Sequence, residues 1–257
     1  MNSNKNVIVH FNKVARSYRS NYEGNNIVSH SFNTRLKIVK TFIGYPKGKK
    51  ILDIGCGPGL LAKELVDISV EFMGIDISER MIKECQQDKT LNKFKFQAID
   101  PVEFLKENQS EKYHIIVCMG LFEYLTDKYT HDLMEKIAQH LYPGGILIGT
   151  YPNINSPYRK VDRIYQKLMG RDVMVPPYTP GVGHKEFSER RLNKEWKQYN
   201  IELNKVAYYN FRLIPKPLDN YLKGLDLLIA RKLQVLSESP FRFLATAMVL
   251  GGKKCSK

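Results

Sequence analysis

A short apolar segment between residues 51 and 61 runs directly into three glycines at alternate positions. Its sequence is Ile-Leu-Asp53-Ile-Gly55-Cys56-Gly57-Pro-Gly59-Leu-Leu. The apolar residues predict the end of a buried strand, and the glycines allow a tight turn in which the backbone approaches a ligand closely. The apolar spacing that follows predicts a helix packed on a sheet, whose first amides can hold an anionic group. This order of elements predicts an α/β fold with a nucleotide-like ligand at the turn.

The spacing of these glycines separates one class of nucleotide ligand from another. The dinucleotide fingerprint G-x-G-x-x-G requires a glycine at position 60, where this chain has Leu60. The third glycine instead lies at position 59, and an acidic residue, Asp53, stands two positions before the first. The departure argues against NAD as the ligand.

With this motif the chain resembles the class I S-adenosylmethionine-dependent methyltransferases, whose first motif reads h-h-D/E-h-G-x-G-x-G. Residues 72–78, 94–100 and 113–119 resemble the second, third and fourth strands of that family, and residues 141–150 resemble its L-x-P-G-G turn into the fifth. The resemblance covers residues 45–155, and residues 201–211 and 243–250 are expected to form the sixth and seventh strands, the antiparallel end of the family's sheet. It implies a Rossmann-like α/β fold: a seven-stranded, mostly parallel sheet with helices on both faces, an antiparallel last strand and helical lid insertions.

The resemblance also implies that the chain binds S-adenosylmethionine. Asp76 stands where the family binds both ribose hydroxyls, and Asp100 where it binds the adenine amino group. A glycine turn and two acidic acceptors suit the amino-acid end, the vicinal hydroxyls and the adenine edge of this donor. The alternative for either aspartate alone is ordinary solvation at a strand end. The expected cofactor-binding residues are Tyr18, Asp53, Gly55, Cys56, Gly57, Gly59, Asp76, Ile77, Asp100, Pro101, Cys118 and Met119.

Length and composition indicate one domain. A chain of 257 residues with 43% hydrophobic content can bury a full core, and strands alternate with helices throughout. We expect an N-terminal helical lid over residues 1–48, a cofactor-binding core over 49–153, and substrate-side insertions at 154–187 and 213–240. The sequence contains no run of about twenty apolar residues and begins without a signal peptide. The four cysteines lack metal or disulfide spacing, which is typical of reduced thiols and predicts a cytoplasmic protein.

The positive charge of the chain lies at its two ends. Residues 1–50 hold ten Lys and Arg against Glu23 alone, and residues 185–257 hold fifteen against seven acidic side chains. In the resembled family these segments cover the substrate side. Basic ends there favour an anionic or carrier-bound acceptor, a membrane surface or RNA, and the alternative is a solvated basic surface without a partner.

The N-terminal segment resembles a motif of small-molecule methyltransferases. Residues 7–18 are similar to F-D-x-x-A-x-x-Y, in which the aromatic residue lies near the methionine end of the cofactor, and Tyr18 and Tyr22 are the candidates here. The alternative is helical core packing.

Two insertions follow the fifth strand. The first combines an amphipathic helix at residues 156–169 with a Pro/Gly loop at 175–184, where substrate contacts are expected. The Val-Pro-Pro-Tyr of this loop differs from the D/N-P-P-Y motif of base-amino methyltransferases, which follows strand 4. The second insertion, residues 218–236, has an apolar stripe flanked by basic residues, which suits a membrane or lipid. The stripe consists of Leu222, Leu225, Ile229, Leu233 and Leu236, and the basic residues are Lys223, Arg231 and Lys232. Because Asp219 and Asp226 dilute its positive charge, packing over the active site or in a homodimer is favoured.

Methyl transfer from a sulfonium requires mainly that the nucleophile be held in line with the methyl group. A hydroxyl acceptor also benefits from a general base. His184 is the first candidate because it lies in the predicted substrate loop and titrates near neutrality. Glu123 is the second, and Tyr124 and Tyr151 are weaker ones. The alternative for His184 is a structural or solvent-exposed histidine.

The segment 156–187 is also similar to ubiquinone-pathway O-methyltransferases, which place Glu, Glu and His after strand 4 as metal ligands. Here the corresponding positions are Gly120, Glu123 and Tyr124, so only one of the three ligands is present. We therefore expect no catalytic metal.

These features predict a S-adenosylmethionine-dependent methyltransferase of a small or lipid-like metabolite, acting at oxygen. The sequence leaves open an RNA methyltransferase, although it lacks a recognisable RNA-binding module, and a non-catalytic binding protein that keeps the fold. DNA is not expected as a partner, and peripheral membrane contact and a homodimer are left open.

Overall fold

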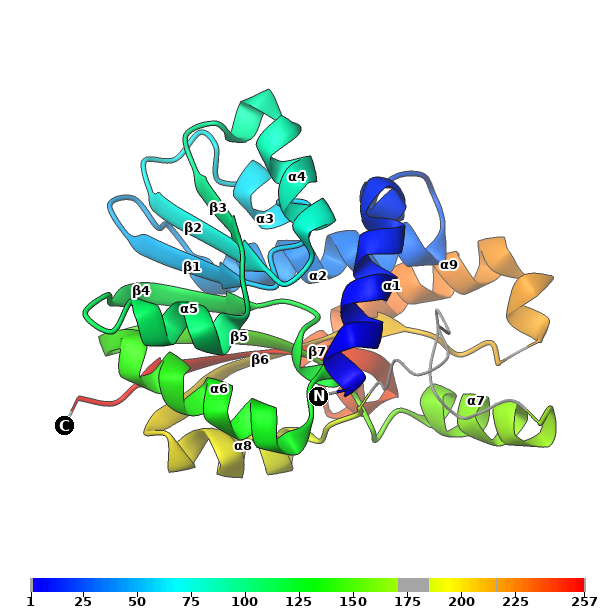
Figure 1. Ribbon diagram of the computed structural model, residues 1–257. Coiled ribbons are helices and arrows are strands. Elements are labelled where there is room, and N and C mark those ends of the chain that lie inside the picture. Colours follow the sequence, from blue (N-terminus) through cyan, green and yellow to red (C-terminus); the bar gives the residue numbers. More distant parts are fainter. Residues whose placement is uncertain (1, 171–184, 216, 257) are drawn as a thin grey trace.

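A computed structural model describes residues 2–170, 185–215 and 217–256. The centre of the fold is one seven-stranded sheet with the strand order β3-β2-β1-β4-β5-β7-β6 (Figure 1). The strands are β1 (Lys50–Ile54), β2 (Glu71–Asp76), β3 (Lys95–Ala98), β4 (Tyr113–Cys118), β5 (Leu141–Pro152), β6 (Ile201–Phe211) and β7 (Ala245–Lys254). This sheet confirms the predicted fold class.

Register brings the chemically important strand ends together. In the parallel pairs β1–β2 and β1–β4, Asp53 lies opposite both Gly74 and Val117. The antiparallel strand β7 pairs with β5 on one side and β6 on the other. Because the order reverses beside β1, the carboxyl ends of β1, β2 and β4 surround the crevice where ligands bind in open α/β sheets.

The last strand begins and ends later than the sequence pattern predicted. We expected residues 243–250, but Phe243 belongs to a 3-10 helix, η6 (Pro240–Leu244), which Ser239 caps by accepting a hydrogen bond from the backbone N–H of Phe241 at 3.2 Å. The strand then continues through two glycines that the apolar pattern did not include. A Cβ on Gly252 would lie 2.7 Å from Trp196, so only glycine lets the strand pass this ring.

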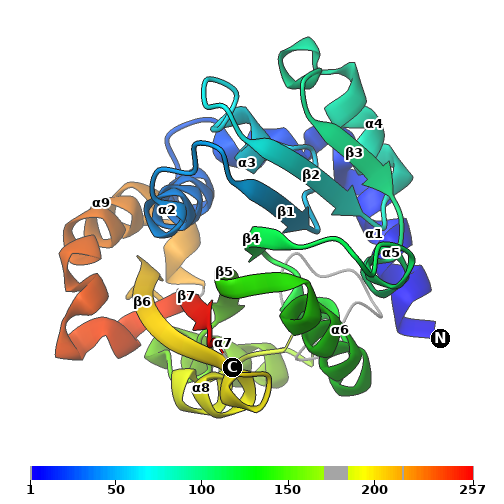
Figure 2. The ribbon, with the colours of Figure 1, turned by 90° about the vertical axis from the view of Figure 1, so that its left-hand side faces the viewer.

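Helices cover both faces of the sheet (Figure 2). On one face, α2 (Ile27–Ile43), α3 (Leu60–Lys63) and α4 (Glu79–Gln87) share a core with the inner strands. On the other face lie α5 (Pro101–Glu107), α6 (Asp127–His140) and α8 (Glu189–Gln198). Two short 3-10 helices, η2 (Lys89–Leu91) and η3 (Phe122–Tyr124), complete the core region.

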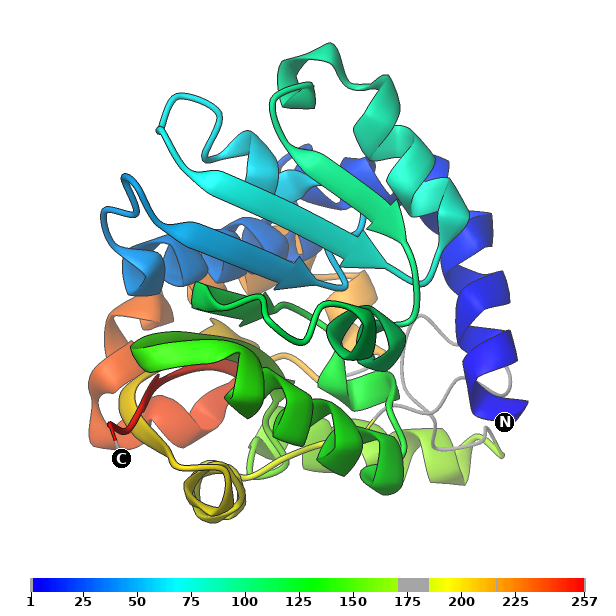
Figure 3. The same ribbon diagram turned by 60° about the vertical axis from the view of Figure 1, so that its left-hand side comes forward.

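The N-terminal segment lies across the carboxyl ends of the strands, as Figure 3 shows for α1 (Asn2–Tyr18). The side-chain oxygen of Asn12 accepts hydrogen bonds from the Ser78 hydroxyl at 2.7 Å and from the Arg80 backbone at 3.3 Å. In the following 3-10 helix, η1 (Arg19–Tyr22), the Arg19 guanidinium binds Asp88 at 2.8 Å and the carbonyl of Pro58 at 2.9 Å. The segment is therefore tied to both the glycine turn and α4.

Four further elements belong to the two insertions: α7 (Pro157–Leu168), η4 (Leu218–Asn220), α9 (Lys223–Leu233) and η5 (Gln234–Glu238). The apolar side of α7 does not pack on the sheet: Val161, Ile164 and Leu168 are all exposed. The helix is held instead by Arg159, whose Nε donates to the carbonyl of Thr246 at 2.6 Å. In the part of the chain that the structure describes, no helix has the length and apolar character needed to cross a membrane.

Candidate functional site

The glycine turn has the left-handed backbone that its sequence predicted. Gly55, Gly57 and Gly59 have φ angles of 74°, 53° and 80°. At Gly59 a Cβ would lie 2.8 Å from the Leu91 side chain, so the third glycine is needed for packing as well as for conformation. A Cβ on Gly57 would meet nothing within 4 Å. The middle of the turn therefore faces open space, where a ligand can approach the backbone.

Asp76 closes the turn from the end of β2. One carboxylate oxygen accepts the backbone N–H of Gly57 at 2.9 Å and the other accepts that of Ser78 at 2.8 Å. Burial raises the pKa of Asp76 to about 6, although these two hydrogen bonds favour the ionised form. Each oxygen keeps further acceptor capacity toward the pocket, which suits a pair of neighbouring hydroxyls.

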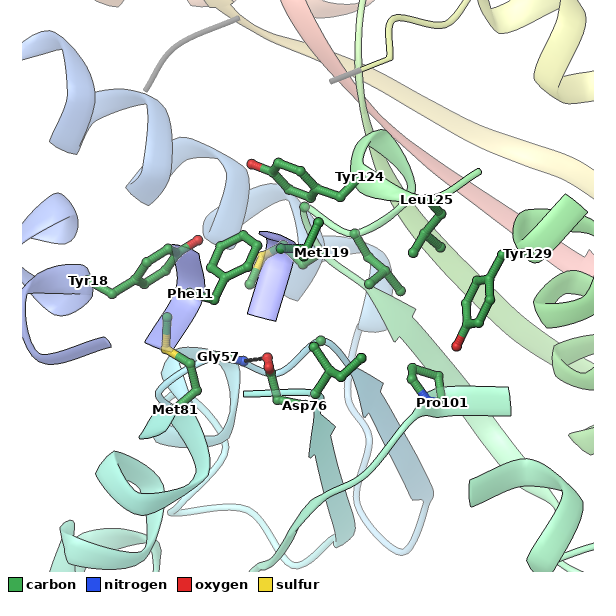
Figure 4. A pocket seen from close by; sticks show the side chains of 15 residues that line it. Phe11, Tyr18, Gly57, Asp76, Met81, Pro101, Met119, Tyr124, Leu125 and Tyr129 are labelled. Atoms are coloured by element: carbon green, nitrogen blue, oxygen red, sulfur yellow. Dashed lines mark hydrogen bonds between the residues drawn. The ribbon is translucent and has the colours of Figure 1, made fainter. Parts of the chain in front are cut away.

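A cavity of about 730 Å³, counting its open mouth, lies over this turn, and Figure 4 shows its lining. It is lined by Val7, Phe11, Tyr18, Gly55, Gly57, Asp76, Ile77, Met81, Pro101, Met119, Gly120, Leu121, Tyr124, Leu125 and Tyr129. In Figure 4, Tyr18 and Phe11 from α1 lie at one end, Pro101 and Tyr129 at the other, and the Gly57–Asp76 hydrogen bond between them. Its size and mostly apolar lining are those of a small-molecule site.

Pro101 and Tyr129 form a slot beside Asp100. Asp100 does not line the cavity itself: one carboxylate oxygen caps α5 by accepting the backbone N–H groups of Val102 and Glu103, and the other accepts the Tyr129 hydroxyl at 2.8 Å. The predicted adenine contact would therefore share an oxygen with one of these bonds. The flat apolar walls of the slot suit an aromatic base.

Asp53 is fully buried at the end of β1, and neither carboxylate oxygen has a hydrogen-bond partner among the described residues. Burial and then the charge of Asp76 raise its pKa to about 8, against the opposing effect of Arg35. A buried carboxyl without a partner is costly, and a cation bound nearby would offset that cost. The positively charged groups of S-adenosylmethionine fit this requirement.

Arg35 supplies a buried cation at the same end of the cavity. Its Nη2 donates to the Tyr22 hydroxyl at 3.0 Å, and its Nη1 lies 3.0 Å from where a Cβ on Gly120 would stand. Its Nε has no partner in the described part of the chain. A guanidinium with spare donors behind Tyr18 and Gly120 suits the carboxylate of an amino-acid ligand. The expectation that the first amides of the following helix, α3, hold that end stays a prediction.

Glu123 lies in η3, directly behind the cavity wall. Its Oε1 is 3.7 Å from the position that a Cβ on Gly120 would occupy. Burial raises its pKa to about 7, opposed by a hydrogen bond to its own backbone and by the charges of Arg35 and Arg159. Burial likewise raises the pKa of neighbouring Tyr124, which lines the cavity and meets Phe11 edge to face at 5.2 Å. A carboxyl that titrates near neutrality beside a cavity is a candidate acid or base.

The structure brings seven of the twelve predicted cofactor residues to the cavity: Tyr18, Gly55, Gly57, Asp76, Ile77, Pro101 and Met119. The other five, Asp53, Cys56, Gly59, Asp100 and Cys118, lie behind its walls. Cys118 is fully buried, and Cys56 contacts the carbonyl of Gly57 through its thiol at 3.6 Å. These five support the turn and strand ends rather than facing the cavity.

The structure places the other catalytic candidates, His184 and Tyr151, outside the cavity lining or outside the described residues. His184 and the rest of the loop 175–184 lie outside the described residues. Tyr151 is a core residue, stacked on Phe122 at 5.2 Å and packed against Phe187, so it does not reach the site. Among residues 2–170, 185–215 and 217–256, no three His, Cys, Asp or Glu side chains are close enough to hold a metal ion.

Sequence reasoning missed Arg35 and most of the apolar lining. Arg35 lies on the same side of α2 as Val39 and Phe42, which are both buried. A cation on the apolar side of an amphipathic helix was the signal that could have indicated a functional residue.

Comparison with known proteins agrees with this geometry. A family model described as a methyltransferase domain matches residues 31–206. The chain therefore belongs to the methyltransferase domain family, with the class I S-adenosylmethionine-dependent fold.

Curated relatives include the ubiquinone biosynthesis O-methyltransferase of Bordetella avium, 29% identical over 119 residues, which are 45% of this chain and 48% of the relative. The protein of the same name from Acinetobacter baylyi is 33% identical over 115 residues, 43% of this chain and 47% of the relative. The chain thus spans about half the length of the curated relatives it matches.

Solved structures match over nearly the whole chain. Magnesium protoporphyrin IX methyltransferase from Synechocystis PCC 6803 with bound SAH has a TM-score of 0.65 and 16% identity, covering 98% of this chain and 99% of that one. A SAM-dependent methyltransferase from Archaeoglobus fulgidus has a TM-score of 0.59 and 17% identity, covering 87% and 94%. At these identities the likeness shows the fold.

Proposed function

We propose that the protein transfers a methyl group from S-adenosylmethionine to an oxygen of a small, lipid-like metabolite. The observation that carries the proposal is the position of Glu123, whose Oε1 lies 3.7 Å from where a Cβ on Gly120 would stand, one layer behind the cavity wall and not in its lining. Burial raises the pKa of this carboxyl to about 7. A base with this pKa can remove the proton of a hydroxyl near neutral pH. Amine acceptors need a base less, because their nitrogen already carries a lone pair once deprotonated by solvent.

The donor end of the cavity would be held by residues with complementary charge. Asp76 would offer acceptors to the ribose hydroxyls, Arg35 a cation to the carboxylate, and Asp53 a buried carboxyl that the cationic groups would ionise. When bound, S-adenosylmethionine supplies an electrophilic methyl group on its sulfonium. The chain orients it and excludes water, and such positioning accounts for much of the acceleration in an in-line displacement.

The acceptor would lie in the aromatic, apolar part of the cavity, next to the methionine end of the donor. Phe11, Tyr18 and Tyr124 meet there, with Val7 beside them. A ring or an isoprenoid chain would be desolvated against these side chains, whereas a charged nucleotide would not. This lining favours a lipid-like acceptor over RNA.

The test is a methyl-transfer assay with hydroxylated aromatic and isoprenoid compounds, each paired with its amino analogue, with SAH formation followed by mass spectrometry. Wild type is expected to methylate hydroxyl compounds, and Glu123→Gln to lose most of kcat while its affinity for S-adenosylmethionine is kept. Glu103→Gln, an exposed acid at the start of α5, is the matched control. Methylation of amines alone, or unchanged kcat in Glu123→Gln, would contradict the proposal.

The alternatives keep their own tests. If the folded protein does not bind S-adenosylmethionine in calorimetry, the proposal that it is a methyltransferase is wrong. Binding without turnover of any acceptor would favour a non-catalytic binding protein. Full activity after EDTA treatment is expected if no metal takes part. The predictions that the acceptor is anionic or carrier-bound, and that His184 acts as the base, stay predictions.

A further inference from the structure

Helix α9 carries apolar residues on two opposite sides. Its inner side buries Leu227 and Ala230 where the helix packs on α2 and β6. Its outer side exposes large apolar residues at helical spacing from η4 into η5: Tyr221, Leu222, Leu225, Leu228 and Val235. The exposed fractions are 83% for Tyr221, 47% for Leu225 and 83% for Val235. Packing within the chain therefore explains only one of the two sides.

The outer side faces away from the molecule. Figure 2 shows α9 beside α2 at the periphery, with no other described element outside it. No described residue of α9 lines the cavity. Packing over the active site or in a homodimer, as the sequence analysis expected for this insertion, stays a prediction.

Charge around this side differs from what the sequence suggested. Asp219 and Asp226, which dilute the positive charge in the sequence, are both buried. They pair with the Arg212 guanidinium at 2.8 and 2.9 Å. The single Arg212 cation offsets one of these two negative charges, and both carboxylates are buried rather than exposed on the outer side. The exposed charges of α9 are Lys223, Arg231 and Lys232.

We propose that this surface docks on an anionic lipid membrane. We define the outer face of α9 by its exposed apolar residues, Tyr221, Leu222, Leu225, Leu228 and Val235. The exposed cations beside it are Lys223, Lys232 and Arg231, the last of which also donates a hydrogen bond to Asn25 at 2.7 Å. A helix with an apolar stripe and basic flanks lies in the membrane plane, with the stripe among the acyl chains and the cations at the headgroups. Docking here goes beyond methyl transfer and requires neither donor nor acceptor.

The same charges argue against a second copy of the chain as the occupant. In a twofold dimer the same patch meets itself, so Lys223, Arg231 and Lys232 would be brought near their own counterparts. Bringing like charges together in an apolar interface makes the free energy of dimerisation less favourable. An anionic membrane surface attracts the same cations.

The experiment is co-sedimentation of the full chain with vesicles of phosphatidylcholine alone and of phosphatidylcholine with an equal part of phosphatidylglycerol. We expect binding to the phosphatidylglycerol vesicles only, weakening as salt is raised. The variant L225E/L228E is expected to lower the partition coefficient at least tenfold. The variant K223E/K232E should lower it by about fivefold or more for each charge, since each cation near an anionic surface contributes ~1 kcal/mol.

Tyr45→Glu is the matched control, because Tyr45 is 76% exposed but belongs to the turn before β1. Circular dichroism and Tm confirm that each variant is folded, and calorimetry with S-adenosylmethionine reports the donor site separately. Equal vesicle binding by wild type and L225E/L228E would overturn the proposal. A dimer in light scattering that L225E/L228E dissociates would overturn it in favour of self-association.

Discussion

Replacing Asp53 by asparagine tests the electrostatics of the donor site. In the folded chain the pKa of Asp53 is raised to about 8, first by burial and then by Asp76. In the unfolded chain it returns to about 3.9. The folded state therefore binds this proton more tightly, so the stability that Asp53 contributes is complete below pH ~4 and is lost as pH rises toward 8.

The magnitude follows from linkage. Between these two pKa values the free energy of unfolding falls by about 1.4 kcal/mol for each pH unit through this one group. From pH 5 to pH 7 the loss is about 2.7 kcal/mol. Asparagine does not titrate, so Asp53→Asn removes this slope and gains stability relative to wild type as pH rises. Asp76 and Glu123 titrate in both proteins, and the difference between the two isolates Asp53.

Urea unfolding of the ligand-free protein at pH 5, 6 and 7 measures the effect. The matched control is Asp88→Asn, because hydrogen bonds from Thr90 and from Lys63 and Arg19 lower the pKa of Asp88. Asp88 is thus ionised throughout this range, and its variant should run parallel to wild type. Parallel pH curves for wild type and Asp53→Asn would refute the reasoning.

Ligand binding gives a second measurement on the same variant. Binding of the cationic donor near Asp53 should ionise the carboxyl and release close to one proton at pH 7. Calorimetry in buffers of different ionisation enthalpy reports that proton. Asp53→Asn should release markedly less, and equal proton release would show that the donor's charge does not act on Asp53.

Further predictions concern the cavity and the segment that covers it. Asp76→Ala should raise the Kd for S-adenosylmethionine about 10- to 100-fold by removing charge-assisted hydrogen bonds to the ribose; an unchanged Kd by calorimetry would remove Asp76 from the site. Arg35→Leu should raise it by a similar factor, and adenosine should bind both proteins equally because it lacks the carboxylate. The activity of wild type should rise with pH through about 7 as Glu123 ionises, and kcat/KM profiles of Glu123→Gln should lack this limb. Asn12→Ala should speed release of SAH about fivefold or more in stopped flow, since the two hydrogen bonds that the Asn12 side chain accepts from Ser78 and Arg80 are lost.

The sequence pattern predicted the fold well in segments whose structure depends on the spacing of nearby residues. The strand, glycine turn and second strand between residues 50 and 76 lie as expected, and β6 matches its predicted bounds. The end of the chain was less accurate, because Gly251 and Gly252 interrupt the apolar pattern of β7. Their role depends on Phe42 and Trp196, which are distant in sequence.

The substrate-side elements were predicted only as helices. Periodicity placed α7 and α9 approximately, but it could not tell which apolar residues meet the protein and which meet solvent. In α9, the expected stripe included Leu222 and Leu225, which are exposed, whereas Leu227 and Ala230 are buried. A helix that is apolar on two sides gives no unique inner side in its sequence.

The sequence by itself was enough to predict the methyl-donor site, because the glycines, Asp53 and Asp76 act through local backbone geometry and fixed spacing. Only the tertiary structure decided which charges meet. Three residues from three different elements, Arg35 of α2, Asp53 of β1 and Glu123 of η3, lie at the same end of the cavity. Asp219 and Asp226 turn inward to Arg212 and leave a basic, apolar surface. Electrostatic interactions fall off with distance in space and not along the chain, so these groupings appear only once the chain is folded.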